Sequence, residues 1–342
     1  MSKYLSNLDF NPKNIGNLKE LISETPFLRE NFLNYVTLRK VQNGDPVGLI
    51  GEMDAVGLAG AGCDPEFGSV GIANAQKRWA LGDWQIPIKI CYEDLVGTVA
   101  EYALKTGTNV GDLTDTDFML QVFEPALSEA IEKMIWRIGW FGDTAAANVT
   151  DGGSITDGVD VNLFKATDGF WKKLFAIGTA NPSQVTAVTT QTKAAMLVSG
   201  VATGLFDNMI MDADSRLTAS SDSVIYVTKA MADALTYDIK NTHHVIMPWE
   251  VVFDGVKVAE YNGVKIAAIS IWDRIINAFE GGDKPYRAVF TNPKNLQVGT
   301  NADGLVSDLD MWFEKKERRT YIYATGKIGT MVLEDSLVHL AY

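Results

Sequence analysis

The sequence has only two cysteines, Cys63 and Cys91, and no pair of cysteines or histidines in it has the spacing of a zinc site. This scarcity excludes a disulfide framework and is typical of a protein that folds in a reducing compartment. No apolar core of a signal peptide stands near the amino terminus, and the longest apolar stretch, residues 194–206, is interrupted by serine, threonine and glycine. We therefore expect neither secretion by a signal peptide nor a membrane-spanning helix.

Basic residues are also few, at 30 lysines and arginines against 43 aspartates and glutamates, which gives a net charge of −13. Nucleic-acid binding draws its affinity from basic side chains that displace counterions, so we expect neither tight nor sequence-specific DNA binding. Hydrophobic residues make up 46% of the chain, enough for a folded protein. A length of 342 residues favours two lobes, or one core with long extensions.

The common catalytic and cofactor motifs are missing as well. There is no phosphate-binding Gly-x-x-x-x-Gly-Lys loop, no Gly-x-Ser-x-Gly turn and no His-Glu-x-x-His helix. Residues 57–62 are glycine-rich but lack the spacing of a dinucleotide-binding turn. We therefore assign no catalytic residue, no metal ligand and no cofactor, and expect a protein that is not an enzyme.

One alternative is an α/β enzyme with a site in residues 160–290, near Asp212, Asp214 and His243. The two aspartates begin like a calcium loop but lack its glycine and its distal glutamate. His243 and His244 precede an apolar run, 245–247, that is typical of a strand, where neighbouring side chains point to opposite faces. They could not easily share a metal ion.

Glycine is concentrated early in the chain. Residues 1–41 have only short pieces of helical spacing and are interpreted as an arm. Residues 42–86 contain too many glycines for a helix but keep strand-forming residues, which predicts a long two-stranded excursion with little core of its own. Its return limb carries Trp79 and Trp84, for which a neighbouring subunit could supply a packing partner.

The strongest helical pattern covers about residues 116–141, where apolar residues recur every three or four positions up to Gly142. Trp136 and Trp140 are interpreted as core residues of this helix. Pro125 predicts a kink, or else marks the first turn of a shorter helix.

Turn residues at 151–160 mark a boundary, and a mixed α/β lobe follows. Within it, Asp254-Gly255 and Asn262-Gly263 separate short strand-like runs and predict an antiparallel meander. The last stretch, from about residue 288, is again rich in strand-forming residues.

This order of parts resembles the major capsid proteins of tailed double-stranded DNA bacteriophages. The residues that carry the likeness are Trp-Gln-Ile-Pro-Ile-Lys-Ile-Cys-Tyr-Glu-Asp-Leu at 84–95, the helix end at 132–143 and the strand-rich ending at 286–342. The resemblance implies an α+β protein with the Hong Kong 97-type capsid fold. Its parts would be an N-terminal arm (1–41), an E-loop hairpin (42–86), a P-domain with a spine helix and antiparallel sheet (87–148), a mixed α/β A-domain (149–290) and return strands of the P-domain (291–342).

The resemblance further implies assembly into hexamers and pentamers of an icosahedral head that encloses DNA without sequence-specific binding. Portal, scaffold and decoration proteins would be partners, and the subunit would reside in the virion capsid after assembly in the bacterial cytoplasm. Because the hairpin at 42–86 cannot bury its own apolar face, we expect it to lie over the P-domain of a neighbour. The expected interface residues are Gly51, Gly57, Gly60, Gly62, Trp79, Trp84 and Pro87. An encapsulin-like compartment, with an enzyme as cargo, is the alternative within this fold.

Overall fold

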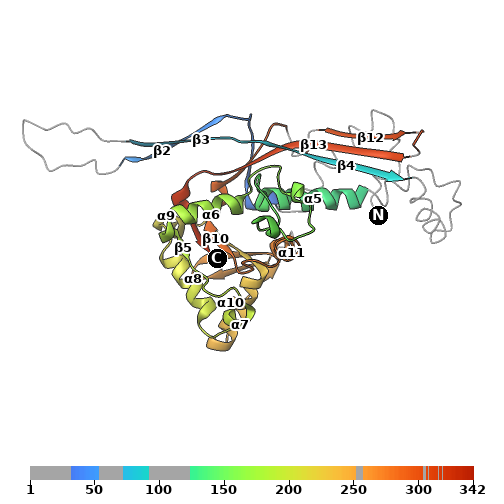
Figure 1. The fold of residues 1–342 in the computed structure, drawn as a ribbon. Helices are drawn as coiled ribbons and strands as arrows, with labels where there is room; N and C mark the ends of the chain where they lie inside the picture. Colours follow the sequence, from blue (N-terminus) through green and yellow to red (C-terminus); the bar gives the residue numbers. More distant parts are fainter. Residues whose placement is uncertain are drawn as a thin grey trace, which may run out of the picture.

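The computed structural model describes residues 32–53, 72–91, 124–251, 257–302, 306, 308–314, 316, 317 and 319–342. This part of the chain forms a long bar, a lobe beneath the bar, and a narrow hairpin that projects from one end (Figure 1). The bar contains a sheet and one long helix, and the lobe contains a second sheet with helices around it. The α+β class expected from the sequence is confirmed.

The bar is built on one long strand, β13. Residues 319–328 of β13 pair antiparallel with β4, and residues 319–325 also pair antiparallel with β12 on the other side. The last residues, 329–332, pair with β11, which pairs in parallel with β1. Along β13, Ile322 and Ala324 are buried while Tyr323 is exposed, the alternation of a sheet with one covered face. The strands are β1 (Thr37–Lys40), β4 (Gly82–Cys91), β11 (Leu296–Thr300), β12 (Asp308–Glu314) and β13 (Arg319–Val332).

The covered face packs on the spine helix α5 (Glu124–Phe141), which ends where the sequence predicted. Trp136 and Trp140 are buried in its core face, so their predicted role is confirmed. Pro125 is the second residue of the described part of this helix. Residues 92–123 lie outside the described residues, so the kink remains a prediction.

The lobe has a seven-stranded sheet in the order β5-β14-β10-β6-β9-β8-β7. Alternate residues of its central strands face two different cores: Ile225 and Val227 pack with α8 and α10, whereas Tyr226 packs with α6 and α11. The sheet is therefore covered by helices on both faces. Its strands are β5 (Val185–Thr186), β6 (Val224–Thr228), β7 (Glu250–Val251), β8 (Lys257–Tyr261), β9 (Val264–Ile269), β10 (Ala288–Thr291) and β14 (Val338–Ala341), and its α-helices are α6 (Phe170–Ala180), α7 (Lys193–Met196), α8 (Val201–Met211), α9 (Ser215–Ala219), α10 (Lys229–His243) and α11 (Ser270–Phe279).

The predicted meander is present as β7, β8 and β9, each antiparallel to the next. Asn262 and Gly263 both have positive φ angles, 49° and 78°, as a two-residue hairpin turn between β8 and β9 requires. The other dipeptide, Asp254-Gly255, lies outside the described residues. One element departs from the expected division: β14 belongs to the sheet of the lobe, although residues 291–342 were expected to be return strands of the P-domain.

Bar and lobe share one continuous core. The Trp140 ring lies 4.5 Å from that of Trp272, which lies 5.0 Å from that of Trp171 (centroid distances), so α5, α11 and α6 meet in a tryptophan cluster. The end of the expected arm also joins this core, because Phe32 and Tyr35 of α2 (Phe32–Tyr35) pack edge-on against Trp136. Residues 1–31 lie outside the described residues. The packing makes bar and lobe one body.

Candidate functional site

The feature that sets this molecule apart is the hairpin of β2 (Pro46–Met53) and β3 (Ile72–Arg78). Figure 1 shows it leaving the bar and extending well beyond it. The two strands pair antiparallel, with an irregular register between Ile50 and Met53, around Gly51. Among the described residues, no third strand pairs with either of them.

An isolated two-stranded ribbon is at best marginally stable in water, because it leaves both faces and both edges to solvent. The two-stranded excursion expected from the sequence is present as the hairpin of β2 and β3. Its described part has no covering layer from its own body, so we expect it to need one from elsewhere. Gly57, Gly60 and Gly62 lie outside the described residues, and their expected interface role stays a prediction.

The base of the hairpin, at residues 79 and 80, crosses the sheet of the bar where two paired strands both carry glycine. Gly299 of β11 and Gly329 of β13 are paired, and the ring of Trp79 lies directly above Gly299. A Cβ atom at Gly299 would stand 2.7 Å from this ring, and one at Gly329 would stand 2.5 Å from the carbonyl oxygen of Ala80. The two glycines form a notch that only residues without side chains can provide.

Two backbone hydrogen bonds close the base. The Trp79 amide donates to the carbonyl of Asp45 at 3.0 Å, and the Gly44 amide donates to the carbonyl of Trp79 at 2.8 Å. Trp79 is 2% exposed and Trp84, which packs in the core beside α5, is 4% exposed. The expectation that a neighbouring subunit covers these tryptophans is wrong, because their own chain does so. Pro87, in contrast, lies exposed on β4, opposite Tyr323.

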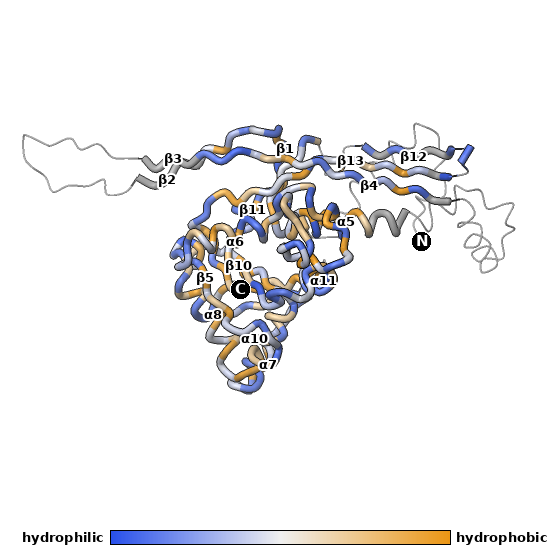
Figure 2. Tube along the Cα trace, in the orientation of Figure 1, coloured by the Kyte–Doolittle hydropathy of each residue, from blue (hydrophilic) through white to orange (hydrophobic). Residues whose placement is uncertain are grey.

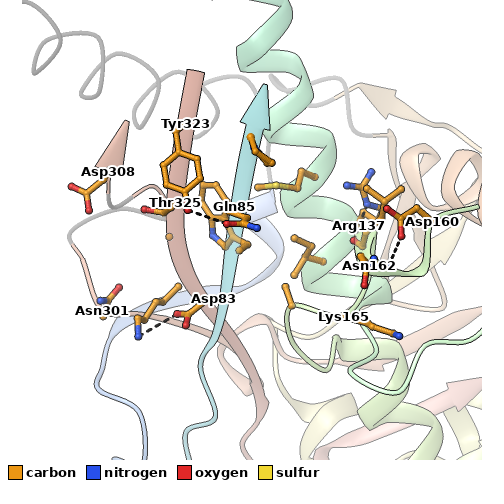
Figure 3. A pocket seen from close by; sticks show the side chains of 18 residues that line it. Asp83, Gln85, Arg137, Asp160, Asn162, Lys165, Asn301, Asp308, Tyr323 and Thr325 are labelled. Atoms are coloured by element: carbon orange, nitrogen blue, oxygen red, sulfur yellow. Dashed lines mark hydrogen bonds and ion pairs between the residues drawn. The ribbon is translucent and has the colours of Figure 1, made fainter. Parts of the chain in front are cut away.

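A long groove lies in the bar, between its sheet and α5 with the adjacent loop 160–166 (Figure 3). Its volume is about 930 Å³. Three carboxylates, Asp83, Asp160 and Asp308, line it together with three cations, Arg137, Lys165 and Lys327. The exposed end of Tyr323 and the Trp84 edge add apolar surface.

Several of these groups are already held in place. Tyr323 donates its hydroxyl proton to Gln85 at 2.9 Å, Lys327 pairs with Asp83 at 3.2 Å, and the Arg137 Nε donates to the Leu163 carbonyl at 3.2 Å. Burial lowers the pKa of Arg137. A groove with balanced charges and fixed polar groups suits another protein surface better than a polyanion or a small charged ligand.

The two aspartates of the alternative enzyme site belong to the ends of different helices. Asp214 caps α9 and pairs with Arg216 at 2.9 Å, which also pairs with Glu334 at 2.8 Å, while Asp212 follows α8. His243 ends α10, and residues 245–247 are not the strand that the sequence suggested. In the described parts of the chain, no group of three histidine, cysteine or carboxylate residues could hold a metal ion.

The lobe does contain a small pocket of about 240 Å³ between residues 187–190 and the helices α7 and α8. Alanine, valine, threonine, methionine and leucine line it, so it offers no acidic or basic side chain for general acid–base catalysis. Nor is any helix in the described ranges both long and apolar enough to cross a membrane.

The sequence did not reveal an apolar patch at the free end of the lobe. Val198, Val245 and Ile246 are 55%, 56% and 78% exposed. A hydrogen bond of 2.9 Å between Ser199 and Thr242 holds the two segments together beside α7 and the end of α10. The apolar run 245–247 was visible in the sequence, but its strand-like pattern suggested a buried element.

No family model and no curated protein matches the sequence, whereas many solved structures match the fold. A chain of the satellite phage P4 procapsid is 14% identical, with a TM-score of 0.50, covering 94% of this chain and 98% of the other. A chain of Mycobacterium phage Ogopogo is 12% identical, with a TM-score of 0.56 and coverages of 92% and 91%. A chain from the capsid of an empty GTA particle is 9% identical, with a TM-score of 0.50 and coverages of 90% and 87%. The described architecture, together with these structural neighbours over nearly the whole chain, shows that this protein has the Hong Kong 97-type fold of phage capsid proteins.

Proposed function

We propose that this chain is the structural major capsid subunit of a tailed bacteriophage, and that copies of it assemble into the hexamers and pentamers of an icosahedral head around the DNA genome. The observation that carries the proposal is the hairpin of β2 and β3, which projects from a well-packed body without a covering layer among the described residues. In a shell, the adjacent subunit supplies that layer.

The shape of the chain supports contact between unlike surfaces of successive copies. The hairpin leaves one end of the bar, whereas the sheet of β4, β12 and β13 lies toward the other end (Figure 1). A hairpin that lies over the next bar makes a head-to-tail contact, and such contacts form closed rings when the rotation per subunit closes. The groove beside α5 and the exposed Pro87 lie on the bar that would receive the hairpin.

The free end of the lobe supplies the second contact. Exposed Val198, Val245 and Ile246 would meet their counterparts where the lobes of one capsomer converge on its axis. The hydropathy along the chain in Figure 2 shows apolar residues in the segments of this part of the lobe, near α7 and α10. Burial of such side chains is worth about 25 cal/mol per Å² of apolar surface removed from water.

The net charge of −13 fits a container that encloses DNA without binding its sequence. The role is structural and involves no catalytic residue, cofactor or metal. Portal, scaffold and decoration proteins would be partners in head assembly, which would take place in the host cytoplasm and end in the virion. The glycines of the hairpin, including Gly51, Gly57, Gly60 and Gly62, would let its backbone bend as the shell changes shape, and a kink at Pro125 would accommodate curvature in the spine helix.

A deletion tests the role of the hairpin. Replacement of residues 52–72 by a short glycine-serine turn leaves the notch and the body intact, so we expect a folded, soluble chain that forms no closed particles. Circular dichroism and thermal unfolding check the fold, and negative-stain electron microscopy checks assembly. Closed particles of normal size from the deletion variant would refute the proposal.

A shell around an enzyme cargo, as in encapsulins, uses the same kind of subunit contacts. Nucleic acid extracted from purified native particles, against a co-purifying cargo enzyme, separates the two functions. An enzyme with a site near Asp212, Asp214 and His243 is disfavoured, since Asp214 pairs with Arg216 and caps α9, Asp212 follows α8, and neither aspartate lines the pocket of the lobe.

A further inference from the structure

The last residues of β13 carry an open edge where the hairpin departs. The ladder between β13 and β4 ends at the pair Ile328↔Gly82, and from Gly329 onward β13 pairs only with β11 among the described strands. The Leu333 amide donates to the carbonyl of Asn295 at 3.0 Å, which fixes the alternation of this ladder. Consequently the carbonyl groups of Thr330 and Val332 point away from β11.

Two lysine side chains fill this edge in place of a strand. Lys173 of α6 donates from Nζ to the Thr330 carbonyl, and Lys77 of β3 donates to the Val332 carbonyl at 2.7 Å. Lys77 also pairs with Asp335, just after β13, at 2.6 Å. The two ammonium groups thus come from the body and from the hairpin, and they hold successive outward carbonyls of a single strand.

Neither lysine resembles a freely solvated surface charge. The pKa of Lys173 is lowered to about 8, chiefly by burial; the charge of Asp168 opposes this shift, and the nearby charge of Lys77 adds to it. Lys77 is 30% exposed and makes two hydrogen bonds whose acceptors lie 255 and 258 residues away in sequence. Two ammonium groups that feel each other's charge repel, so both need the carbonyl and carboxylate oxygens that accept their hydrogen bonds.

We propose that Lys77 and Lys173 form a two-point clamp on β13 that sets the direction in which the hairpin leaves the body. The Trp79 notch fixes where the hairpin crosses the sheet, and the Lys77 contact with Val332 and Asp335 fixes its orientation beyond that crossing. This inference rests on the proposed shell function for its consequence: the direction of the hairpin decides where it lands on the next subunit, and thereby the curvature of the shell.

The direction can be measured in the full-length, unassembled chain. Spin labels are placed at exposed Gly48 in β2 and exposed Ala194 in α7, in a background where Cys63 and Cys91 are replaced by serine. Pulsed electron paramagnetic resonance then reports the distance between hairpin and lobe. We expect a narrow distance distribution for the parent chain, its loss in Lys77→Ala, and its retention in Lys77→Arg, which keeps a cation with several donors.

Asp335→Asn serves as a second variant that leaves Lys77 in place, should Lys77→Ala fail to fold, and we expect a broadened distribution there too. Lys294→Ala is the matched control, because Lys294 is an exposed lysine that pairs with Asp222 at 2.8 Å on the surface of the body. An unchanged distribution in folded Lys77→Ala, or in Asp335→Asn, would overturn the clamp.

Assembly reactions with the same variants connect the clamp to the shell. We expect Lys77→Ala to yield particles of altered or mixed diameter, and Lys77→Arg and Lys294→Ala to yield the parent diameter. Uniform parent particles from Lys77→Ala would overturn the clamp. If the parent chain forms no particles at all, the proposed function fails, whereas the resonance measurement on the unassembled chain still decides whether the clamp exists.

Discussion

The Arg287 guanidinium is enclosed where α5, α6 and α11 meet. Its side chain is 2% exposed, and its Nη2 lies 2.5 Å from the Glu280 carboxylate. The rings of Phe141, Trp171 and Phe175 lie between 5.4 and 5.8 Å from its central carbon. The planar cation can stack on aromatic faces and bind a carboxylate at the same time, which a lysine could not do equally well.

Replacement of Arg287 by methionine should therefore destabilise the fold severely. The variant keeps much of the side-chain volume but leaves the Glu280 charge buried without its partner, a loss of about 3–5 kcal/mol. Chemical unfolding followed by tryptophan fluorescence measures the change, and the double variant Arg287→Met with Glu280→Gln should recover part of it. If Arg287→Met unfolds at the same denaturant concentration as the parent chain, the enclosed pair does not hold bar and lobe together.

The crossing of hairpin and bar depends on two glycines that are distant from the hairpin in sequence. Gly329→Ala would place a Cβ atom 2.5 Å from the Ala80 carbonyl oxygen, so either the hairpin base or β13 must shift. We expect a loss of about 1–3 kcal/mol in the free energy of unfolding, the usual cost of overpacking. We also expect faster proteolysis near residues 79–81, because the base of the hairpin would no longer pack closely on the sheet.

Gly204→Ala is the control for a glycine-to-alanine change outside the notch, and we expect it to raise stability where Gly329→Ala lowers it. Gly204 lies inside α8 with no atom within 4 Å of an added Cβ, so alanine should stabilise the chain by about 0.5–1 kcal/mol. Equal stability and equal proteolysis of the Gly329→Ala variant and the parent would show that the notch does not seat the hairpin.

The same elements show what could be predicted from the sequence and what could not. The spine helix and the Asn262-Gly263 turn depend on local spacing and backbone preference, and both were predicted. The notch that receives Trp79 was not predicted, because Gly299 and Gly329 lie more than two hundred positions further along the chain and carry no local signal. An aromatic residue on a glycine-rich limb suggested a partner in another subunit, but the fold brings one from the same chain.

Other errors have the same origin. β14 has a strand-forming pattern that is equally compatible with the sheet of the bar and that of the lobe, and only tertiary packing assigns it to the lobe. The run after His243 resembles a buried strand, yet it is not a strand, and Val245 and Ile246 are exposed at the end of the lobe while only Met247 is buried. In the candidate site, the projecting hairpin was predicted from glycine density, whereas the groove and the lysine clamp join residues from opposite ends of the chain.

At the scale of the whole molecule, the described residues form one packed body and one hairpin that extends from it. The tryptophan cluster joins bar and lobe, while the hairpin extends from the bar with pairing only between its own strands in the described residues. A self-contained protein gains nothing from such an extension, since an uncovered ribbon costs conformational entropy and exposes strand edges. In the proposed shell, repeated docking of the ribbon on identical neighbours would remove both costs and would build a closed assembly.

The state of the purified, full-length chain under assembly conditions tests this account most directly. Analytical ultracentrifugation with negative-stain electron microscopy should find closed particles of megadalton mass, in which the hairpin of each subunit lies over the bar of the next. A chain that remains a folded monomer or small oligomer under all assembly conditions, with the hairpin packed on its own body, would contradict it.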